Sequence, residues 1–260
     1  MILVFSVCAA DLDKAVEIAD WIVALGPQRA HSCVLMFPAE LSISPTDAAK
    51  IQILSDALVP VFKRVIEYPV DAVPTGKFIV PNYMLKMAAL KMMEFANLPE
   101  FAQDDGWYFF EPDCTPLFAG WLDAVAAEYR DAVARGFAFL GSVTDNGTMP
   151  RSAVYHVATF ASVASIRQLS LQVPAQQELR KEIGSVAMPA STLQDNQSSR
   201  DYVRAAQGVL RCRTMPGHKE ARNHPVQTTV AVVHGCKDGS LLRLLREERE
   251  LNLIDPEGRR

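Results

Sequence analysis

The first third of the chain alternates between short apolar runs and segments with helical spacing. Apolar runs over 2–7 and 32–37 predict two strands, and a third short strand is predicted over 62–68. Between them, apolar residues recur every three or four positions over 11–25, and a further helix is predicted over 45–58. This β-α-β-α-β order favours an α/β fold with a mostly parallel, Rossmann-like sheet and right-handed crossovers.

The same alternation continues towards the middle of the chain. A methionine-rich helix is predicted over 82–95, and we interpret its methionines as core-filling residues. A four-residue aromatic strand follows at Trp107 to Phe110. An amphipathic helix over 120–135 and a strand over 137–140 complete this part, which fits a single α/β domain with helices flanking its sheet.

After about residue 145 the pattern weakens. Residues 172–199 are rich in Gln, Ser, Pro and Asn and predict a loop or lid. A helix is expected over 202–210, a strand over 228–233 and a helix over 240–250.

Small polar residues stand at the expected helix starts and are candidate caps. Asp11 or Asp13 is expected to cap the first helix, Thr46 the second and Ser240 the last.

Composition narrows the class further. The 260 residues are 49% hydrophobic and 22% charged, which indicates a globular chain with an ample core. A net charge of −4 gives no overall attraction to nucleic acid. No apolar run approaches the roughly 18 residues of a membrane span. Five scattered cysteines without a CxxC pair indicate free thiols in a reducing compartment, so we expect a cytoplasmic protein.

The aromatic strand ends abruptly at Glu111-Pro112-Asp113. Pro112 cannot donate to a strand ladder, so the two carboxylates should lie at the carboxyl end of a central strand. Open α/β sheets bind ligands at that edge. Carboxylates there suit Mg²⁺ or Mn²⁺, although a solvated strand-end turn would have the same sequence.

A second motif follows the apolar run 228–233. His234 could bind a divalent metal through its neutral ring, and Gly235 permits a close approach of the backbone. Lys237 and the start of the following helix would suit a diphosphate. The motif lacks the GxxxxGK[ST] pattern of a Walker A loop. Alternatively, His234 is a strand-end histidine and Lys237 a solvated loop residue.

Together these motifs resemble those of GT-A-fold glycosyltransferases. The segment FFEPDCTPL resembles the metal-binding DxD motif, with Glu111 in place of its first aspartate, and HGCKDG resembles the late metal-histidine and diphosphate loop. The stretch 107–129 is particularly similar to bacteriophage enzymes that glycosylate hydroxymethylated DNA bases. The resemblance implies a GT-A-like domain over 1–245, with a nucleotide-sugar-binding half (1–120), an acceptor-binding half carrying the metal and diphosphate loop (121–245), and a tail (246–260).

The resemblance also implies roles for individual residues. Asp113 and His234 would bind Mn²⁺ or Mg²⁺, with Glu111 supporting them or contacting the donor. The donor would be a nucleotide diphosphate sugar, with a UDP-sugar as the first expectation. Its binding residues would be Ser6, Val7, Cys8 and Asp11 for the base and ribose, Asn82 and Lys86 for other donor contacts, and Gly235, Lys237 and Ser240 for the diphosphate.

A catalytic base is less evident. An inverting transfer needs a carboxylate to deprotonate the acceptor hydroxyl. Asp195 is our choice, with Asp145 and Asp201 as alternatives, and a retaining enzyme would need no such base.

The acceptor side has one local clue, a basic stretch within an acidic chain. It suggests contact with DNA phosphates, with the target base presented to the pocket, either in place or flipped, although a solvated helical face would have the same composition. The residues are Arg200, Arg204, Arg211, Arg213, Lys219 and Arg222.

These observations predict a metal-dependent glycosyltransferase acting on 5-hydroxymethylcytosine or another hydroxymethylpyrimidine in phage DNA. Open alternatives are a polysaccharide or lipopolysaccharide glycosyltransferase, a nucleotidyltransferase, and a noncatalytic nucleotide- or DNA-binding module.

Overall fold

The computed structural model describes most of the chain's first half and several shorter segments of its second half. The described residues are 1–76, 79–101, 106–137, 139–141, 154–155, 187–195, 199–204, 210–214 and 224–250.

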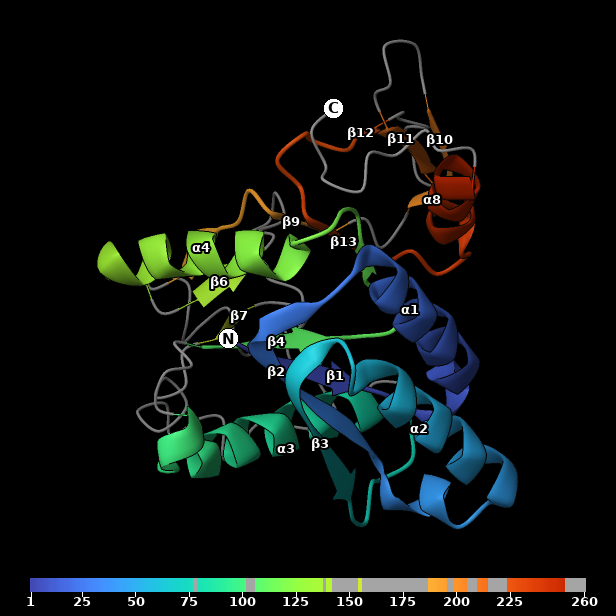
Figure 1. The fold of residues 1–260 in the computed structure, drawn as a ribbon, viewed down its shortest axis with the longest axis vertical. Helices are drawn as coiled ribbons and strands as arrows, with labels where there is room; N and C mark the ends of the chain where they lie inside the picture. Colours follow the sequence, from blue (N-terminus) through green and yellow to red (C-terminus); the bar gives the residue numbers. More distant parts are fainter. Residues whose placement is uncertain are drawn as a thin grey trace.

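The centre of the molecule is a seven-stranded sheet in the order β3-β2-β1-β4-β7-β6-β8 (Figure 1). The first four strands are parallel to one another, β7 is antiparallel to both β4 and β6, and β8 is parallel to β6. The expected mostly parallel α/β sheet is therefore confirmed. The strands are β1 (Ile2–Ser6), β2 (Gln28–Pro38), β3 (Phe62–Val70), β4 (Trp107–Phe110), β6 (Phe139–Gly141), β7 (Val154–Tyr155) and β8 (Ala187–Pro189).

Helices cover both faces of this sheet. The core residues of α1 (Leu12–Leu25), α2 (Pro45–Leu58) and α4 (Trp121–Ala134) belong to one apolar cluster. Those of α3 (Ile79–Phe95) belong to a second cluster on the opposite face. The methionines Met84 and Met92 are fully buried in it, as their core-filling interpretation predicts.

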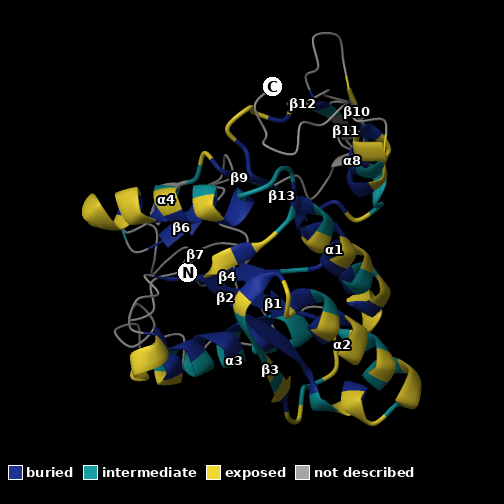
Figure 2. Ribbon diagram, in the orientation of Figure 1, coloured by how far each residue is buried: buried dark blue, intermediate teal, exposed yellow. Residues whose placement is uncertain are grey.

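The alternation of side chains along β1 explains why the sheet needs both layers. Leu3 and Phe5 point into the first cluster, whereas Ile2 and Val4 point into the second. All four are essentially inaccessible to solvent, and Figure 2 shows the central strands in the buried colour. Strands buried on both faces have continuous apolar sequences, which is why they were predictable.

Aromatic rings fill the first cluster beside the end of β4. Phe110 packs edge-on against Phe5 and Tyr108, with ring centroids 5.3 and 5.8 Å apart. Its ring also lies 5.6 Å from that of Trp121 at the start of α4. This packing fixes the point at which β4 leaves the sheet.

Two three-stranded sheets accompany the main sheet. One has the order β5-β13-β9, from β5 (Thr115–Pro116), β13 (Val232–His234) and β9 (Leu193–Asp195). The other has the order β10-β11-β12, from β10 (Ser199–Arg204), β11 (Leu210–Thr214) and β12 (His224–Pro225). The helix α8 (Ser240–Glu250) and the 3-10 turns Ala9–Asp11, Ala39–Ser42 and Pro99–Phe101 complete the described elements.

The structure corrects several local predictions in the second half. The helix expected over 202–210 is wrong at both ends, because Tyr202 to Arg204 lie in β10 and Leu210 begins β11, its antiparallel partner. The strand expected over 228–233 is shorter, since it begins only at Val232. Within the predicted loop 172–199, β8 and β9 are strands. Tyr202 to Arg204, Leu210, β8 and β9 are extended because backbone pairing with a neighbouring strand overrides the local pattern.

The predicted caps are also wrong in detail. Ser44, rather than Thr46, caps α2 by accepting a hydrogen bond from the Asp47 amide at 3.5 Å. Asp11 is at the N-cap position of α1, but its side chain makes no capping bond. At α8 the carboxylate of Asp238 accepts from the Ser240 amide at 3.2 Å, so Asp238 takes the role expected of Ser240.

Two further features bear on the predictions. Among the described helices, none is both long enough and apolar enough to span a membrane. Cys8, Cys33, Cys114 and Cys236 are thiols that are not joined in disulfides, in agreement with the expectation for those four.

Replacing Phe110 with alanine tests the aromatic packing at the end of β4. Removing a fully buried ring that contacts three other rings should lower the free energy of unfolding by about 3–5 kcal/mol. Urea denaturation of Phe110→Ala measures this. The control Ile43→Ala truncates a side chain that is 79% exposed and should change stability by less than about 0.5 kcal/mol.

Candidate metal and diphosphate site

The site lies at the carboxyl ends of β1 and β4, as the sequence predicts. After Phe110 the chain makes a tight turn in which the Cys114 amide donates to the Glu111 carbonyl at 2.9 Å. It then continues as β5, which pairs antiparallel with β13, so that Thr115 lies opposite Val233. This pairing brings His234 next to the acidic turn.

Backbone hydrogen bonds join the acidic turn directly to the histidine-glycine loop. The carbonyl of Asp113 accepts from the Gly235 amide at 3.1 Å and from the Cys236 amide at 3.0 Å. Gly235 has φ +90°, a conformation that disfavours residues with a Cβ atom. The glycine therefore allows the loop to present two successive amides to one oxygen.

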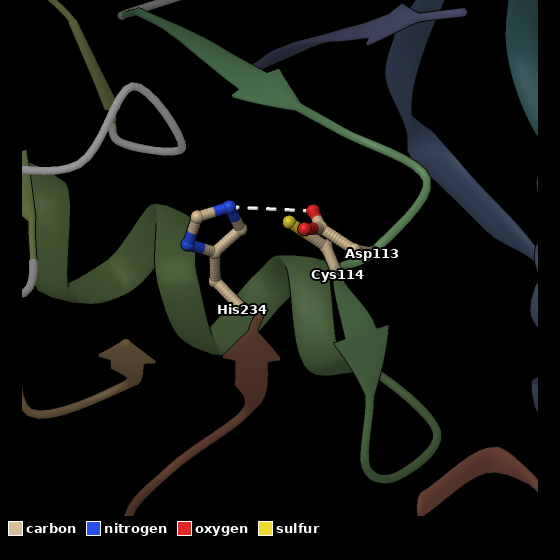
Figure 3. A group of neighbouring side chains, drawn as sticks. All are labelled: Asp113, Cys114 and His234. Atoms are coloured by element: carbon tan, nitrogen blue, oxygen red, sulfur yellow. Dashed lines mark ion pairs between the residues drawn. The ribbon is translucent and has the colours of Figure 1, made fainter. Parts of the chain in front are cut away.

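The acidic and imidazole side chains converge at this junction. Nε2 of His234 lies 3.3 Å from Oδ1 of Asp113 and 3.4 Å from Oε2 of Glu111. Figure 3 shows the His234 ring facing the Asp113 carboxylate, with the Cys114 sulfur beside that carboxylate. One potential ligand atom from each of Asp113, Cys114 and His234 lies within 4.8 Å of the others. The side chains of Asp113 and His234 are only 14% and 7% exposed.

Lysines supply positive charge beside these acids. Nζ of Lys237 lies 4.0 Å from Oδ2 of Asp113. Lys14, from the first turn of α1, donates to the Lys237 carbonyl at 3.1 Å. Burial by itself raises the pKa of Asp113, but the His234 ring and then the two lysines outweigh burial and lower that pKa to about 2. Asp113 is therefore an anion at neutral pH.

Asp11 extends the acidic group towards the end of β1. Desolvation raises its pKa, and the negative charges of Asp113 and Glu111 raise it further. The charge effect shows that the end of the first strand and the acidic turn belong to one electrostatic environment.

The donor set fits a divalent cation. Oδ1 of Asp113 is buried and faces Nε2 of His234 at 3.3 Å. A cation between these atoms would coordinate both. The imidazole and the nearby thiol are softer donors than Mg²⁺ prefers, so the set favours Mn²⁺ over Mg²⁺.

Other predicted donor residues lie at the end of β1, in the turn after it and on α3. Ser6 ends β1 and is buried, Val7 continues it by donating its amide to the Met36 carbonyl at 2.8 Å, and Cys8 precedes the turn that carries Asp11. Asn82 is fully buried in the first turn of α3, and Lys86 is half-buried one turn further on. Their contacts with a donor remain predictions.

Two further residues lie close to the metal and diphosphate elements. Ser240 begins α8, and its hydroxyl accepts from the Tyr202 amide at 3.2 Å, so it orders β10. The backbone of Asp195 lies opposite His234 in the parallel pairing of β9 and β13. The structure thus places the predicted base position next to His234 in the small sheet. Asp145, an alternative base, lies outside the described residues.

The basic stretch is partly accounted for by structure. Arg204 forms a bidentate ion pair with Glu248 of α8, at 2.6 and 2.9 Å, so its charge is already neutralised within the protein. The antiparallel register places Arg200 opposite Arg213, and Arg211 lies in the same hairpin. Asp201, the other alternative base, also lies on β10. Lys219 and Arg222 lie outside the described residues.

Lys14 and Cys114 are members of the site that sequence reasoning missed. Lys14 follows Asp11 by one helical turn, a spacing that places both on one side of the helix start, but only the fold shows which side meets the loop. Cys114 directly follows the predicted metal ligand, and its place in the cluster depends on the turn after Pro112.

Comparisons with known proteins agree with this architecture. No protein-family model and no curated protein matches the sequence. Among solved structures, the chain resembles the galactosyltransferase LgtC in complex with donor and acceptor sugar analogues, with a TM-score of 0.52 and 13% identity over 91% of this chain and 87% of LgtC. It thus has the GT-A-type fold of that enzyme.

A second structural likeness is weaker. The glycosyltransferase GlyE of Streptococcus pneumoniae TIGR4 matches with a TM-score of 0.44 and 9% identity over 72% of this chain. The matched region spans 44% of the GlyE chain.

Replacing Gly235 with alanine tests the junction between the two loops. The residue is held at φ +90°, and a Cβ there should cost about 1–2 kcal/mol of stability. Relief of that strain would pull the amide off the Asp113 carbonyl, so we expect Mn²⁺ affinity to fall about tenfold. Titration followed by electron paramagnetic resonance of free Mn²⁺ measures it.

The matched control is Gly26→Ala, which imposes similar strain at φ +100° away from the site. A Cβ added at Gly26 would meet open space, with no neighbouring side chain within 4 Å, so this variant should lose stability while keeping wild-type Mn²⁺ affinity. Equal Mn²⁺ affinities for both variants would contradict the role given to the Gly235 junction.

Proposed function

We propose that the protein is a metal-dependent glycosyltransferase that transfers a sugar from a nucleotide diphosphate sugar to a hydroxyl acceptor. The observation that carries this proposal is the convergence of Asp113, Glu111 and His234 at the carboxyl edge of the sheet, beside Lys237. Carboxylate and imidazole ligands next to an ammonium group suit a cation bound to a diphosphate. The GT-A-type fold supports the same chemistry.

The residues have distinct tasks in this proposal. Asp113 and His234 would hold Mn²⁺ or, less favourably, Mg²⁺, with Glu111 supporting them. Such a cation, when bound, neutralises the charge that develops on the leaving diphosphate. Lys237 would bind the diphosphate oxygens beside Gly235, and Asp11 would face the nucleotide end. A UDP-sugar is the first donor to test.

The acceptor hydroxyl must lose a proton during an inverting transfer. Asp195 is the proposed base, and its support is the backbone register that puts it opposite His234. If the enzyme retains configuration, Asp195 would have no such task.

Substitution of the two metal ligands tests the proposal. Asp113→Asn and His234→Gln should each lower Mn²⁺-dependent turnover of UDP-, GDP- and TDP-sugars by about 100-fold or more, because each removes a contact to the cation. Product nucleotide is measured by chromatography. Asp123→Asn, an exposed carboxylate-to-amide change on α4, is the control and should retain activity.

Turnover that is unaffected by Asp113→Asn and His234→Gln would reject the site. Release of pyrophosphate rather than a nucleoside diphosphate would identify a nucleotidyltransferase instead. Binding of nucleotide without turnover of any tested sugar would favour a noncatalytic binding module.

We propose hydroxymethylpyrimidine in phage DNA as the acceptor to test first. Its support is the sequence resemblance of 107–129 and the arginines of the β10-β11 hairpin, where Arg200 and Arg213 are register partners. Those arginines would position the DNA through phosphates, since phosphate contacts orient a protein on DNA. The internal ion pair of Arg204 removes one of the expected contacts.

An acceptor panel separates this hypothesis from its main rival. The protein, Mn²⁺ and the donor found above are incubated with hydroxymethylcytosine-containing DNA, matched cytosine DNA, and oligosaccharide or lipopolysaccharide acceptors. We expect a hexose or pentose mass gain only on the hydroxymethylated DNA, and the gain should weaken with salt as phosphate contacts are screened. Transfer to saccharides alone would reject the DNA acceptor and favour a polysaccharide glycosyltransferase.

A further inference from the structure

We propose that Glu128 of α4 is a positioning residue that holds His234 in place through the Ser191–Thr192 turn. Glu128 lies outside the cluster of acids and imidazole, and none of the sequence motifs assigns it a role. The inference rests on the proposed function, because it assigns Glu128 a task at the same metal site.

The carboxylate of Glu128 binds one short segment through several donors. Oε1 accepts from the Ser191 amide at 2.6 Å, and Oε2 accepts from the Thr192 amide at 2.9 Å. Oε2 also accepts from the Thr192 hydroxyl. Each of the two oxygens thus faces a backbone donor, so the site requires an acceptor on both arms of the side chain. Charged acceptors form the stronger hydrogen bonds of this kind.

The same turn also holds the strand that carries His234. The carbonyl of Thr192 accepts from the amides of Ala231 and Val232, at 2.7 and 3.0 Å. The Thr229 hydroxyl donates to the Ser191 carbonyl at 3.2 Å. Glu128 therefore fixes one peptide segment whose carbonyls in turn fix 229–232, immediately before His234.

The strand pairing extends this link to His234 itself. Leu193 and Val232 begin the parallel pairing of β9 and β13, and the register ends with Asp195 opposite His234. A shift of the Ser191–Thr192 turn would move both residues together. Because one peptide rise in a strand is about 3.3 Å, even a partial slip would exceed the tolerance of a metal site.

The helix that carries Glu128 is itself fixed to the main sheet. Trp121, Val125 and Tyr129 of α4 are completely buried in the first apolar cluster. Glu128 thus connects a rigid helix of the main sheet to the small sheet that holds the histidine. The acidic turn follows β4 of the main sheet, so the Glu128 link is a second connection between the two halves of the metal site, besides the hydrogen bonds of the Asp113 carbonyl.

Glu128→Gln is the most direct test, because it keeps the size of the side chain but turns one acceptor into an amide donor. One arm of glutamine would then face a backbone N–H. We expect Mn²⁺ affinity, measured by electron paramagnetic resonance, to fall about tenfold, as for other residues that orient metal ligands. The KM for the nucleotide sugar should rise at fixed Mn²⁺ and return towards the wild-type value at saturating Mn²⁺.

Asp123→Asn is the matched control, since it makes the same carboxylate-to-amide change on the same helix. The partner of Asp123 is His31 of β2, at 2.9 Å, rather than the Ser191–Thr192 turn. The Mn²⁺ affinity of this variant should equal that of the wild-type protein.

Thr192→Val completes a double-mutant cycle with Glu128→Gln. The valine removes only the hydroxyl donor, so the effects of the two substitutions on Mn²⁺ affinity should be non-additive. This coupling separates positioning from general loss of stability, which thermal denaturation of each variant measures in parallel.

The outcomes are distinguishable. Wild-type Mn²⁺ affinity in Glu128→Gln, or additive effects in the cycle, would overturn the positioning role and leave the proposed function standing. Failure of the wild-type protein itself to bind Mn²⁺ would overturn the proposed function and the inference together.

Discussion

The carbonyl oxygen of Asp113 is the point on which the site depends. It accepts hydrogen bonds from two successive amides, those of Gly235 and Cys236, and so fastens a loop from late in the chain to the turn after the central strand. The same residue directs its carboxylate at the His234 ring. Asp113 therefore fixes the backbone of the Gly235–Cys236 loop and also supplies the carboxylate that faces His234.

Placing carboxylates and an imidazole in so little solvent has an electrostatic cost. Burial opposes the charge of Asp113, and the neighbouring His234, Lys237 and Lys14 outweigh it, so the pKa of this carboxyl falls. Asp11 shows the opposite balance, because desolvation and its acidic neighbours raise its pKa. The cluster is thus a centre of concentrated negative charge with a cationic rim, which suits a bound cation and an anionic diphosphate.

The described segments of the second half of the chain are attached to this centre and to one another by polar links. The β10-β11 hairpin is tied to α8 by the Arg204–Glu248 pair and to the start of α8 by the Tyr202 amide. The small β5-β13-β9 sheet is tied to α4 by Glu128. The segments with the weakest apolar patterning are therefore held around the site by ionic and polar links. This explains why a stretch rich in arginine has a structural as well as a potential binding role.

The sequence by itself determined the parts of the protein whose cause is local. Continuous apolar runs predicted β1, β2 and β4, and helical spacing predicted α1 and α4. Pro112 predicted the end of β4, and so the position of Asp113 at the edge of the sheet. That Asp113 and His234 lie together was a hypothesis, based on the acidic motif after β4 and the histidine-glycine motif after residue 233.

The tertiary structure decided everything that depends on pairing between elements, whether those elements are close together or far apart in the sequence. It placed both ends of 202–210 in strands instead of a helix, because an antiparallel partner satisfies their backbone groups. It gave Glu111 a contact with His234, brought Lys14 and Cys114 to the site, and placed Asp195 opposite the histidine. A local sequence pattern indicates which face of a helix or strand is buried. Which other element packs against that face depends on the fold of the whole chain.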